Sequence, residues 1–373
     1  MKQKLITLIT ISFLLTTCNY NSNQDSSSNQ TGENSISFPI SFYKKFKGKI
    51  GNESIVMDLF KKDSIFSGKY YFTKIGVPIS INGHINSDGN FKLSEINVRQ
   101  DATCIFSGLF TNEKSMAGVC TNSMTNKALT FNLSETENIA TLSFESKHSE
   151  NCKNAERNKK HPTADLMYLD TLCTTLDLDL IKVMLPSKQL TQRINKTIEG
   201  IIGEYSYDEK KYISIDALMN SVNSVENNNG FAQSIRCDLV TNTNDILCLR
   251  IGQSICGFGA AHPSSVWNFY NFNLKTGEQI LLEDLLLPNY EKTMNQVAEK
   301  KFVEAHGSDG WNFEKGNFKL NKDFAITPGG LLFSFDQYEI GAYVMGSPEV
   351  FIPYTDIQNL IKPDGVLKLL QKR

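Results

Sequence analysis

The sequence has no apolar run long enough to span a membrane. Its longest, Leu5–Leu15, contains about a dozen residues, whereas a spanning helix needs about 20. The chain after this segment is therefore expected to be soluble. Lys2 and Lys4 precede the run, which is the charge pattern of a secretory signal. We predict a signal peptide at residues 1–17.

The sequence also lacks the short motifs that mark common catalytic and metal sites. Its five histidines form neither His-Glu-x-x-His nor His-x-His, and there is no Cys-x-x-Cys and no Gly-x-Ser-x-Gly. A metal site would require distant residues to converge, and the thiol of Cys256 has no base beside it. We therefore predict no catalytic residue, no metal and no cofactor.

A strong net charge is absent as well, since the whole chain carries −2. The two parts nevertheless differ. Residues 1–162 contain 19 Lys and Arg against 14 Asp and Glu, whereas residues 163–373 contain 19 against 26. The acidic second part disfavours nucleic acid and suits a cationic partner, although solubility alone explains the same charge.

Cys18 follows the apolar run at a spacing that resembles a bacterial lipobox, in which the cysteine is acylated and becomes the mature N-terminus. Thr17 departs from the usual small residue, and an ordinary secretory peptide is the alternative. Residues 18–37 are polar and are predicted to form a flexible tether. A lipid at Cys18 predicts anchoring to the cell membrane on its extracytoplasmic side. In a Gram-negative cell the protein would lie at the outer membrane or in the periplasm.

Seven cysteines remain after Cys18, an odd number for a compartment in which disulfides persist. A predicted four-residue loop, Thr241–Asn244, would pair Val240 with Asp245 and set two cysteines opposite each other. A second pair flanks a turn between consecutive strands, and a third brackets the region between the two halves. The predicted disulfides are Cys104–Cys120, Cys152–Cys173 and Cys237–Cys248, with Cys256 left over.

Residues 38–146 alternate in the manner of short strands separated by turns. Several of these segments contain one central glycine, as at Gly83 and Gly108, which suits the tight bends of barrel corners. Seven or eight strands at about ten-residue spacing predict an all-β domain, an antiparallel meander that forms a small barrel or sandwich. The charged segment 147–162 lacks apolar periodicity and is the predicted linker.

Residues 163–373 mix strands with helices. Helices are predicted at Ser187–Glu204, Ser214–Val225 and Glu283–Phe302, the last interrupted near Pro288, and strands at Leu176–Met184, Asp323–Phe335 and Glu349–Pro353. This order predicts an α+β domain with helices on one face of a mainly antiparallel sheet.

The second half also contains a series of motifs in a fixed order. They are Gly257-Phe258-Gly259-Ala260-Ala261-His262-Pro263, Asn271–Glu278, Leu281–Leu285, Tyr338–Gly346 and Glu349–Pro353. Over about residues 165–373 the chain resembles the extracytoplasmic module shared by the anti-sigma factor RsiV and the peptidoglycan deacetylase PdaC. The resemblance implies extracytoplasmic recognition, because this module binds lysozyme in RsiV and accompanies a catalytic domain in PdaC. With no transmembrane helix and no deacetylase domain after Arg373, only the sensing or docking role is expected here.

Two segments of this module are predicted to contact a ligand or partner. The first is the loop residues Gly259, Ala260, Ala261, His262 and Pro263, because loops on a rigid scaffold often carry function. The alternative is that His262-Pro263 only fixes a turn. The second segment supplies Tyr338 and Tyr343, because tyrosines dominate many interfaces. For these two rings the alternative is core packing.

These observations predict a non-enzymatic, membrane-anchored binding lipoprotein of the cell envelope. Its partner would be a cell-wall component such as peptidoglycan or a wall-degrading protein such as lysozyme, and not nucleic acid. One alternative is a cell-wall hydrolase or deacetylase that uses His262 with Asp336 or Glu339. The second alternative is a structural envelope lipoprotein.

Overall fold

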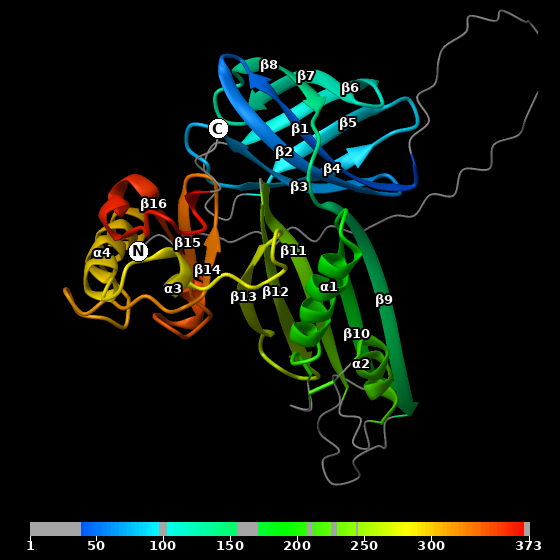
Figure 1. Cartoon of the computed structure of the whole chain (residues 1–373). Helices are drawn as coiled ribbons and strands as arrows, with labels where there is room; N and C mark the ends of the chain where they lie inside the picture. Colours follow the sequence, from blue (N-terminus) through cyan, green and yellow to red (C-terminus); the bar gives the residue numbers. More distant parts are fainter. Residues whose placement is uncertain are drawn as a thin grey trace, which may run out of the picture. The chain divides into compact units, whose positions relative to one another are not determined.

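The computed structural model describes residues 39–96, 103–154, 171–206, 211–212, 214–224, 230–243 and 245–368 (Figure 1). The predicted signal peptide at 1–17, Cys18 and the tether at 18–37 lie outside these residues. Residues Ile36–Arg373 form one compact unit. Among the described residues, no helix combines the length and apolar character needed to cross a membrane.

Eight antiparallel strands form a closed barrel, which confirms the all-β prediction for the first part of the chain. They are β1 (Ser41–Ile50), β2 (Glu53–Lys62), β3 (Ile65–Phe72), β4 (Ile79–Ile85), β5 (Asn90–Glu95), β6 (Cys104–Asn112), β7 (Ser115–Asn122) and β8 (Ala128–Glu135). The barrel closes because β1 pairs with β8 as well as with β2. Large side chains fill the interior, and Phe46, Phe66, Tyr70, Phe106 and Phe110 are each at most 1% exposed. The barrel therefore has a packed core.

Glycines within the strands allow this small barrel to close. Gly108 on β6 lies directly opposite Gly118 on β7. A Cβ atom on Gly108 would collide with the backbone of Ala117, and one on Gly118 with the backbone of Ser107. The two strands thus approach more closely than any side chain would permit.

A five-stranded sheet follows, in the order β13-β12-β11-β10-β9. Its strands are β9 (Thr141–Asn154), β10 (Thr171–Met184), β11 (Phe231–Thr243), β12 (Ile246–Gly257) and β13 (Ser264–Asn273). β10 and β11 are parallel, and the other neighbours are antiparallel. Figure 1 shows α1 (Lys188–Ile202) and α2 (Ile215–Ser221) over one face of this sheet.

The two helices over the sheet begin where the sequence predicts. Ser187 caps α1 by accepting a hydrogen bond from the N–H of Leu190, and Ser214 caps α2 in the same way. The apolar residues of α1 and α2 share one buried core with β10, β11 and β12. The predicted α+β class is therefore confirmed, with the qualification that strands dominate and helices are few.

A three-stranded sheet completes the fold. It contains β14 (Phe324–Ile326), β15 (Gly330–Ser334) and β16 (Glu349–Pro353). Two further helices are α3 (Leu282–Leu285) and α4 (Glu291–His306). Short 3-10 turns are η1 (Val222–Ser224), η2 (Tyr343–Met345), η3 (Tyr354–Asp356) and η4 (Gln358–Leu360). The predicted helix at Glu283–Phe302 is two helices with Pro288 between them. The predicted strand at Asp323–Phe335 is two strands joined by a turn.

The predicted linker at 147–162 requires correction. Lys147–Asn154 form the second half of β9, which pairs along its full length with β10 and crosses the predicted boundary after residue 146. This strand has a charged, exposed face, as in the contact of 2.7 Å between His148 Nδ1 and Asp177 Oδ1. Such a face has no apolar alternation, so the segment gave no strand signal in the sequence. Residues 155–162 lie outside the described residues.

Two of the three predicted disulfides are present, namely Cys104–Cys120 and Cys152–Cys173. Cys152 and Cys173 are directly opposed on β9 and β10. Disulfides persist in oxidising compartments, so these two indicate an extracytoplasmic location.

The predicted Cys237–Cys248 disulfide is wrong, because both cysteines are free and buried. In the observed register, which shifts between Leu239 and Thr241, Cys237 lies opposite Ile251 and Cys248 lies opposite Thr241. Since Ile251 and Cys248 are three positions apart and strand side chains alternate, the two thiols face opposite sides of the sheet. The hairpin prediction failed mainly because the strands continue to Thr243 and Ile246, which pair directly, so the connection is two residues shorter than the predicted loop. The bulge then changes the register by one residue. Cys256, which was left over, is free and exposed.

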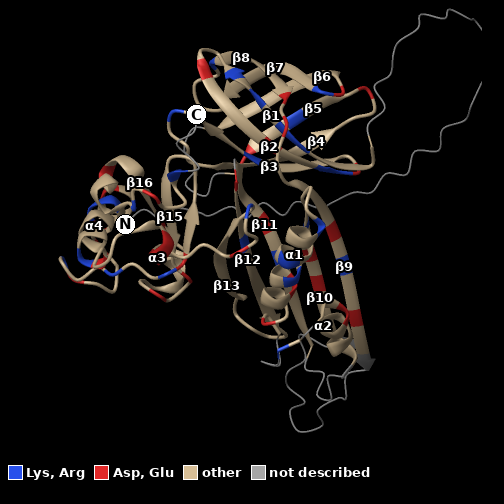
Figure 2. Cartoon of the chain, viewed as in Figure 1, with Lys and Arg blue, Asp and Glu red and all other residues tan. Residues whose placement is uncertain are grey.

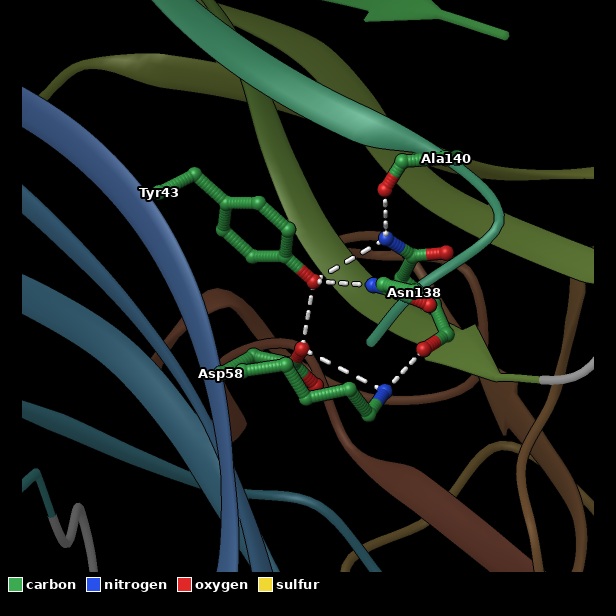
Figure 3. Close-up of polar contacts among 6 residues, drawn as sticks. Tyr43, Asp58, Asn138 and Ala140 are labelled. Atoms are coloured by element: carbon green, nitrogen blue, oxygen red, sulfur yellow. Dashed lines mark hydrogen bonds and ion pairs between the residues drawn. The ribbon is translucent and has the colours of Figure 1, made fainter. Parts of the chain in front are cut away.

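A buried polar network joins the barrel to β11 (Figure 3). Lys45 on β1 forms an ion pair with Asp58 on β2 at 3.4 Å, and both side chains are 5% exposed. Asp58 also accepts a hydrogen bond of 2.6 Å from the hydroxyl of Tyr43. Asn242 of β11 donates to that hydroxyl at 2.9 Å, while its carbonyl accepts from Lys45. We call this set the junction network.

Candidate functional site

The predicted contact loop joins β12 to β13. It begins with a tight turn in which the N–H of Ala260 donates to the carbonyl of Gly257 at 3.0 Å, and Gly259 has φ +79°. That conformation favours glycine. All five predicted residues, Gly259 to Pro263, are exposed.

The structure brings the two predicted segments together, although they are about 76 residues apart in the sequence. The imidazole of His262 stacks on the ring of Tyr343, with centroids 3.7 Å apart and planes inclined by 24°. The Tyr338 ring lies 5.5 Å from that of Tyr343. The hydroxyl of Tyr343 donates to the carbonyl of Pro263 at 3.1 Å. We call His262, Tyr338 and Tyr343 the aromatic triad.

Tyr338 holds its ring outward through an unusual backbone conformation. Its φ is +69°, and its side chain is 60% exposed. A tight turn fixes this position, because Asp336 and Glu339 exchange hydrogen bonds of 2.8 and 3.1 Å. A bulky residue in the left-handed region is unfavourable, and such positions cluster at functional sites. This conformation supports a role for Tyr338 outside core packing.

Exposed apolar side chains accompany the triad. Phe258, in the same loop as His262, is 46% exposed, and Val344, next to Tyr343, is 88% exposed. Together with the triad they supply the mixture of apolar area and polar groups that is typical of binding surfaces.

The two ring nitrogens of His262 face a carbonyl and a hydroxyl. Among the described residues, Nδ1 faces the carbonyl of Pro263 at 3.1 Å and Nε2 faces the hydroxyl of Tyr338 at 3.4 Å. Neither Asp336 nor Glu339 is hydrogen-bonded to the imidazole; both carboxylates accept from other donors. The pairing that the hydrolase alternative requires is thus not formed in this structure.

Carboxylates line the outer edge of β13, directly beside the triad. Asp323 accepts a hydrogen bond of 2.5 Å from the N–H of Phe269, and Asp336 accepts one of 3.1 Å from the N–H of Trp267. β13 is the last strand of its sheet, so these side chains satisfy backbone groups that an edge leaves unpaired. We call Asp323, Asp336 and Glu339 the acidic edge.

Burial changes the titration of this edge. It raises the pKa of Asp323 to about 7, against the opposing effects of the Phe269 N–H and the Arg250 guanidinium. Burial also raises the pKa of Asp336, and the neighbouring charge of Glu339 acts in the same direction. The full negative charge of the edge therefore develops only above neutral pH.

The acidic edge lines a cavity of about 440 Å³. The other lining residues include Trp267, Tyr270, Asn321 and Lys322. Because Tyr338 lies between Asp336 and Glu339 in the chain, this edge pocket and the triad form one continuous candidate surface. Elsewhere, Figure 2 shows basic and acidic residues interspersed on both the barrel and the sheets, with acidic residues recurring along β9 and β10.

Only one group of potential metal ligands occurs in the described part of the chain. It consists of Glu150, Cys152 and Cys173, and the two cysteines form a disulfide with each other. Bonded in this way, their sulfurs do not provide the thiolates that bind metals.

One known protein family matches a stretch of the sequence that contributes to this surface. Residues 283–355 match the family described as "Protein of unknown function (DUF3298)". The match includes the acidic edge and both tyrosines of the triad, whereas His262 precedes it. The finer resemblance to the RsiV and PdaC module stays a prediction.

Two crystal structures of DUF3298 proteins are similar to this chain. One, from Bacteroides fragilis NCTC 9343, aligns with a TM-score of 0.49 and 15% identity over 64% of this chain and 100% of that chain. The other, from Pseudomonas aeruginosa PAO1, aligns with a TM-score of 0.46 and 20% identity over 60% of this chain and 95% of that chain. The curated proteins gave no significant match.

Sequence reasoning identified the triad but missed part of its surroundings. Asp336 and Glu339 were considered only as partners of His262, and Asp323 was not singled out. Asp323 immediately precedes an apolar strand, which is a hint of an edge cap, but its partner Phe269 is 54 residues away. No local pattern reveals that contact.

Proposed function

We propose that this chain is a non-enzymatic extracytoplasmic binding lipoprotein that recognises a wall-degrading protein such as lysozyme or a cell-wall component such as peptidoglycan. The observation that carries the proposal is the aromatic triad, with His262 and Tyr338 exposed, which two distant segments assemble beside the acidic edge.

The triad has the properties of an interface anchor. His262 stacks on Tyr343, the Tyr338 ring lies beside them, and both hydroxyls are hydrogen-bonded. A partner therefore meets a preformed surface, and little ordering is needed on binding. Tyrosine rings bury much apolar area and keep a polar tip, which makes them frequent centres of binding energy.

The acidic edge favours a basic protein as the partner. Three carboxylates line the edge pocket, with Lys322 as the one basic residue among the residues that line it. A lysine or arginine from a partner would find complementary charge there, which favours fast and specific association. Lysozyme is a basic protein that attacks the cell wall, and it is therefore the first partner to test. Peptidoglycan is the second, because aromatic rings also bind the faces of sugars.

Anchoring at Cys18 is the part of the proposal that rests on sequence alone. A lipid and a tether would hold the binding surface near the membrane while allowing reach. The measurement is detergent phase partitioning of the full chain in a bacterial host. Cys18→Ser should move the protein to the aqueous phase, and retention in the detergent phase would contradict anchoring at this residue.

The binding experiment uses the chain from residue 19 onward, immobilised and titrated with lysozyme, together with sedimentation on insoluble peptidoglycan. The wild-type chain should bind at least one of the two. Tyr338→Ala should weaken that binding by about tenfold or more, as expected for a hot-spot aromatic residue. Leu281→Ala is the matched control, because Leu281 is 51% exposed but belongs to neither the triad nor the acidic edge. Failure to bind either probe would refute the proposal.

The enzymatic alternative predicts a different result. A wall hydrolase or deacetylase would release product from peptidoglycan and would lose activity in His262→Ala. Such a loss would contradict the non-enzymatic part of the proposal, whereas retained binding with no product release would support it.

A further inference from the structure

A second cavity, of about 590 Å³, lies where the barrel meets the C-terminal sheets. The barrel contributes residues of β3, β4 and β5, and the sheets contribute residues of β11, β12, β13, β15 and β16. Much of its wall is apolar and includes Ile79, Val240 and Phe269. Its charged residues are Lys69, Glu95, Arg250 and Glu349. We call it the junction cavity.

Lys69 reaches the cavity from the outer surface of the barrel. Tyr70, its neighbour on β3, points into the barrel core, so Lys69 points the other way. Within the described part of the chain its ammonium has neither a hydrogen bond nor an ion pair. Burial lowers the pKa of Lys69, and the charges of Asp238 and Glu349 oppose this change only from a distance. The Lys69 side chain is only partly exposed, and a partly desolvated ammonium without a partner is unfavourable.

Arg250 supplies a second unpartnered donor. Its Nε is buried and has no hydrogen-bond acceptor among the described residues. The guanidinium is held in place by the rings of Trp267 and Phe269, at 5.4 and 5.5 Å from their centroids. Its Nη1 atom lies 3.5 Å from a carboxylate oxygen of Glu349. The side chain is therefore fixed while Nε remains available.

The acceptors of the cavity are already engaged. The carboxylate of Glu95 accepts from the hydroxyl of Tyr70 and, at 2.8 Å, from the N–H of Cys104. Glu349 faces Arg250. Among the described residues that line the cavity, the buried Nε of Arg250 and the partly exposed ammonium of Lys69 are thus donors without a protein acceptor. Buried polar groups such as the Arg250 Nε are almost always satisfied by protein, water or ligand.

We propose that the junction cavity binds a small organic carboxylate, whose anionic group accepts hydrogen bonds from Lys69 and Arg250 while its apolar body lies against the apolar wall. A monoanion fits better than a phosphate dianion, because Glu95 and Glu349 would repel the extra charge. The volume suits a small ligand, since such sites usually measure about 300–1,000 Å³. This site is separate from the aromatic triad and does not rest on the proposed recognition function.

The test is calorimetric titration of the chain from residue 19 onward with hexanoate. Saturable one-to-one binding is expected, with hexan-1-ol at least tenfold weaker because it has the same body without the charge. Inorganic phosphate should not compete. Equal binding of hexanoate and hexan-1-ol, displacement by phosphate, or no hexanoate binding in the millimolar range would overturn the proposal.

Variants locate the binding within the cavity. Lys69→Met should weaken hexanoate binding tenfold or more without lowering the thermal midpoint, because it removes an unpaired ammonium and keeps the aliphatic length. Lys69→Arg should retain binding. Lys92→Met is the control, since Lys92 is exposed on β5 and does not line the cavity. Unchanged affinity in Lys69→Met, or equal loss in Lys92→Met, contradicts the assignment.

Discussion

The aromatic triad and the junction cavity hold their polar groups in opposite ways. In the triad, His262 and Tyr338 are exposed, Tyr343 is partly buried, and the three side chains contact one another. In the cavity, the ammonium of Lys69 and the Nε of Arg250 are donors without an acceptor among the described residues. A surface whose groups are satisfied among themselves suits a macromolecular partner that adds area. A cavity with unsatisfied donors suits a small ligand that completes their hydrogen bonds.

The largest expected effect comes from breaking the junction network, which ties the barrel to β11. Lys45→Met leaves the buried carboxylate of Asp58 without its cation, and removing one member of a buried pair destabilises a protein by about 3–5 kcal/mol. The free energy of unfolding, measured by urea denaturation, should fall by this amount. Because the junction network ties the barrel to β11, hexanoate binding should be lost while lysozyme binding survives in the folded protein.

The double variant Lys45→Met/Asp58→Leu is the control for this effect. It removes both charges and should recover most of the lost stability. If the free energy of unfolding of Lys45→Met decreased by less than about 1 kcal/mol, the ion pair would not be what holds the junction together.

A smaller, pH-dependent effect belongs to the acidic edge. Burial raises the folded-state pKa of Asp323 to about 7, above the value of about 3.9 expected in the unfolded chain. Between these values the folded protein holds a proton that the unfolded chain releases, so the free energy of unfolding falls as pH rises from about 4 to 7. The contribution is no more than about 4 kcal/mol.

Asp323→Asn should flatten this part of the pH profile, because the amide oxygen can still accept from the N–H of Phe269. Denaturation of both proteins at intervals between pH 4 and 8 measures the difference. Parallel profiles would mean that Asp323 is not the group that titrates.

The smallest expected change in stability is that of Tyr338→Gly, a variant that distinguishes a role of this residue in folding from a role in recognition. Tyr338→Gly relieves the strain of a φ of +69° but gives the unfolded chain more freedom. These effects oppose each other, so stability should change by about 1 kcal/mol or less. Partner binding should nevertheless fall tenfold or more, because the ring is lost. A large loss of stability would instead assign Tyr338 to the core.

Local patterns were enough to predict most of the elements. Ser187 and Ser214 cap helices as expected, and the glycines within the barrel strands predicted close bends. Long-range register was harder. A connection between β11 and β12 that is two residues shorter than predicted, together with the bulge beside Val240, moved Cys237 away from Cys248. The charged second half of β9 was mistaken for a linker because its exposed face lacks alternation.

The candidate sites also differ in whether local sequence or only long-range contacts reveal them. Residue type and local sequence singled out His262, Tyr338 and Tyr343 individually, although no pattern showed that they meet. Lys69 had no sequence signal, because an outward lysine on a barrel strand is ordinary. Only its position facing Arg250, 181 positions later in the chain, makes it distinctive.

The most direct test is one set of lysozyme and peptidoglycan titrations on three proteins: the wild-type chain, Tyr338→Ala and Lys69→Met. We predict that the wild type binds one of these probes, that Tyr338→Ala loses at least tenfold in affinity, and that Lys69→Met binds like the wild type. Absence of wild-type binding, or equal affinity of the wild type and Tyr338→Ala for the bound probe, would contradict recognition through the aromatic triad.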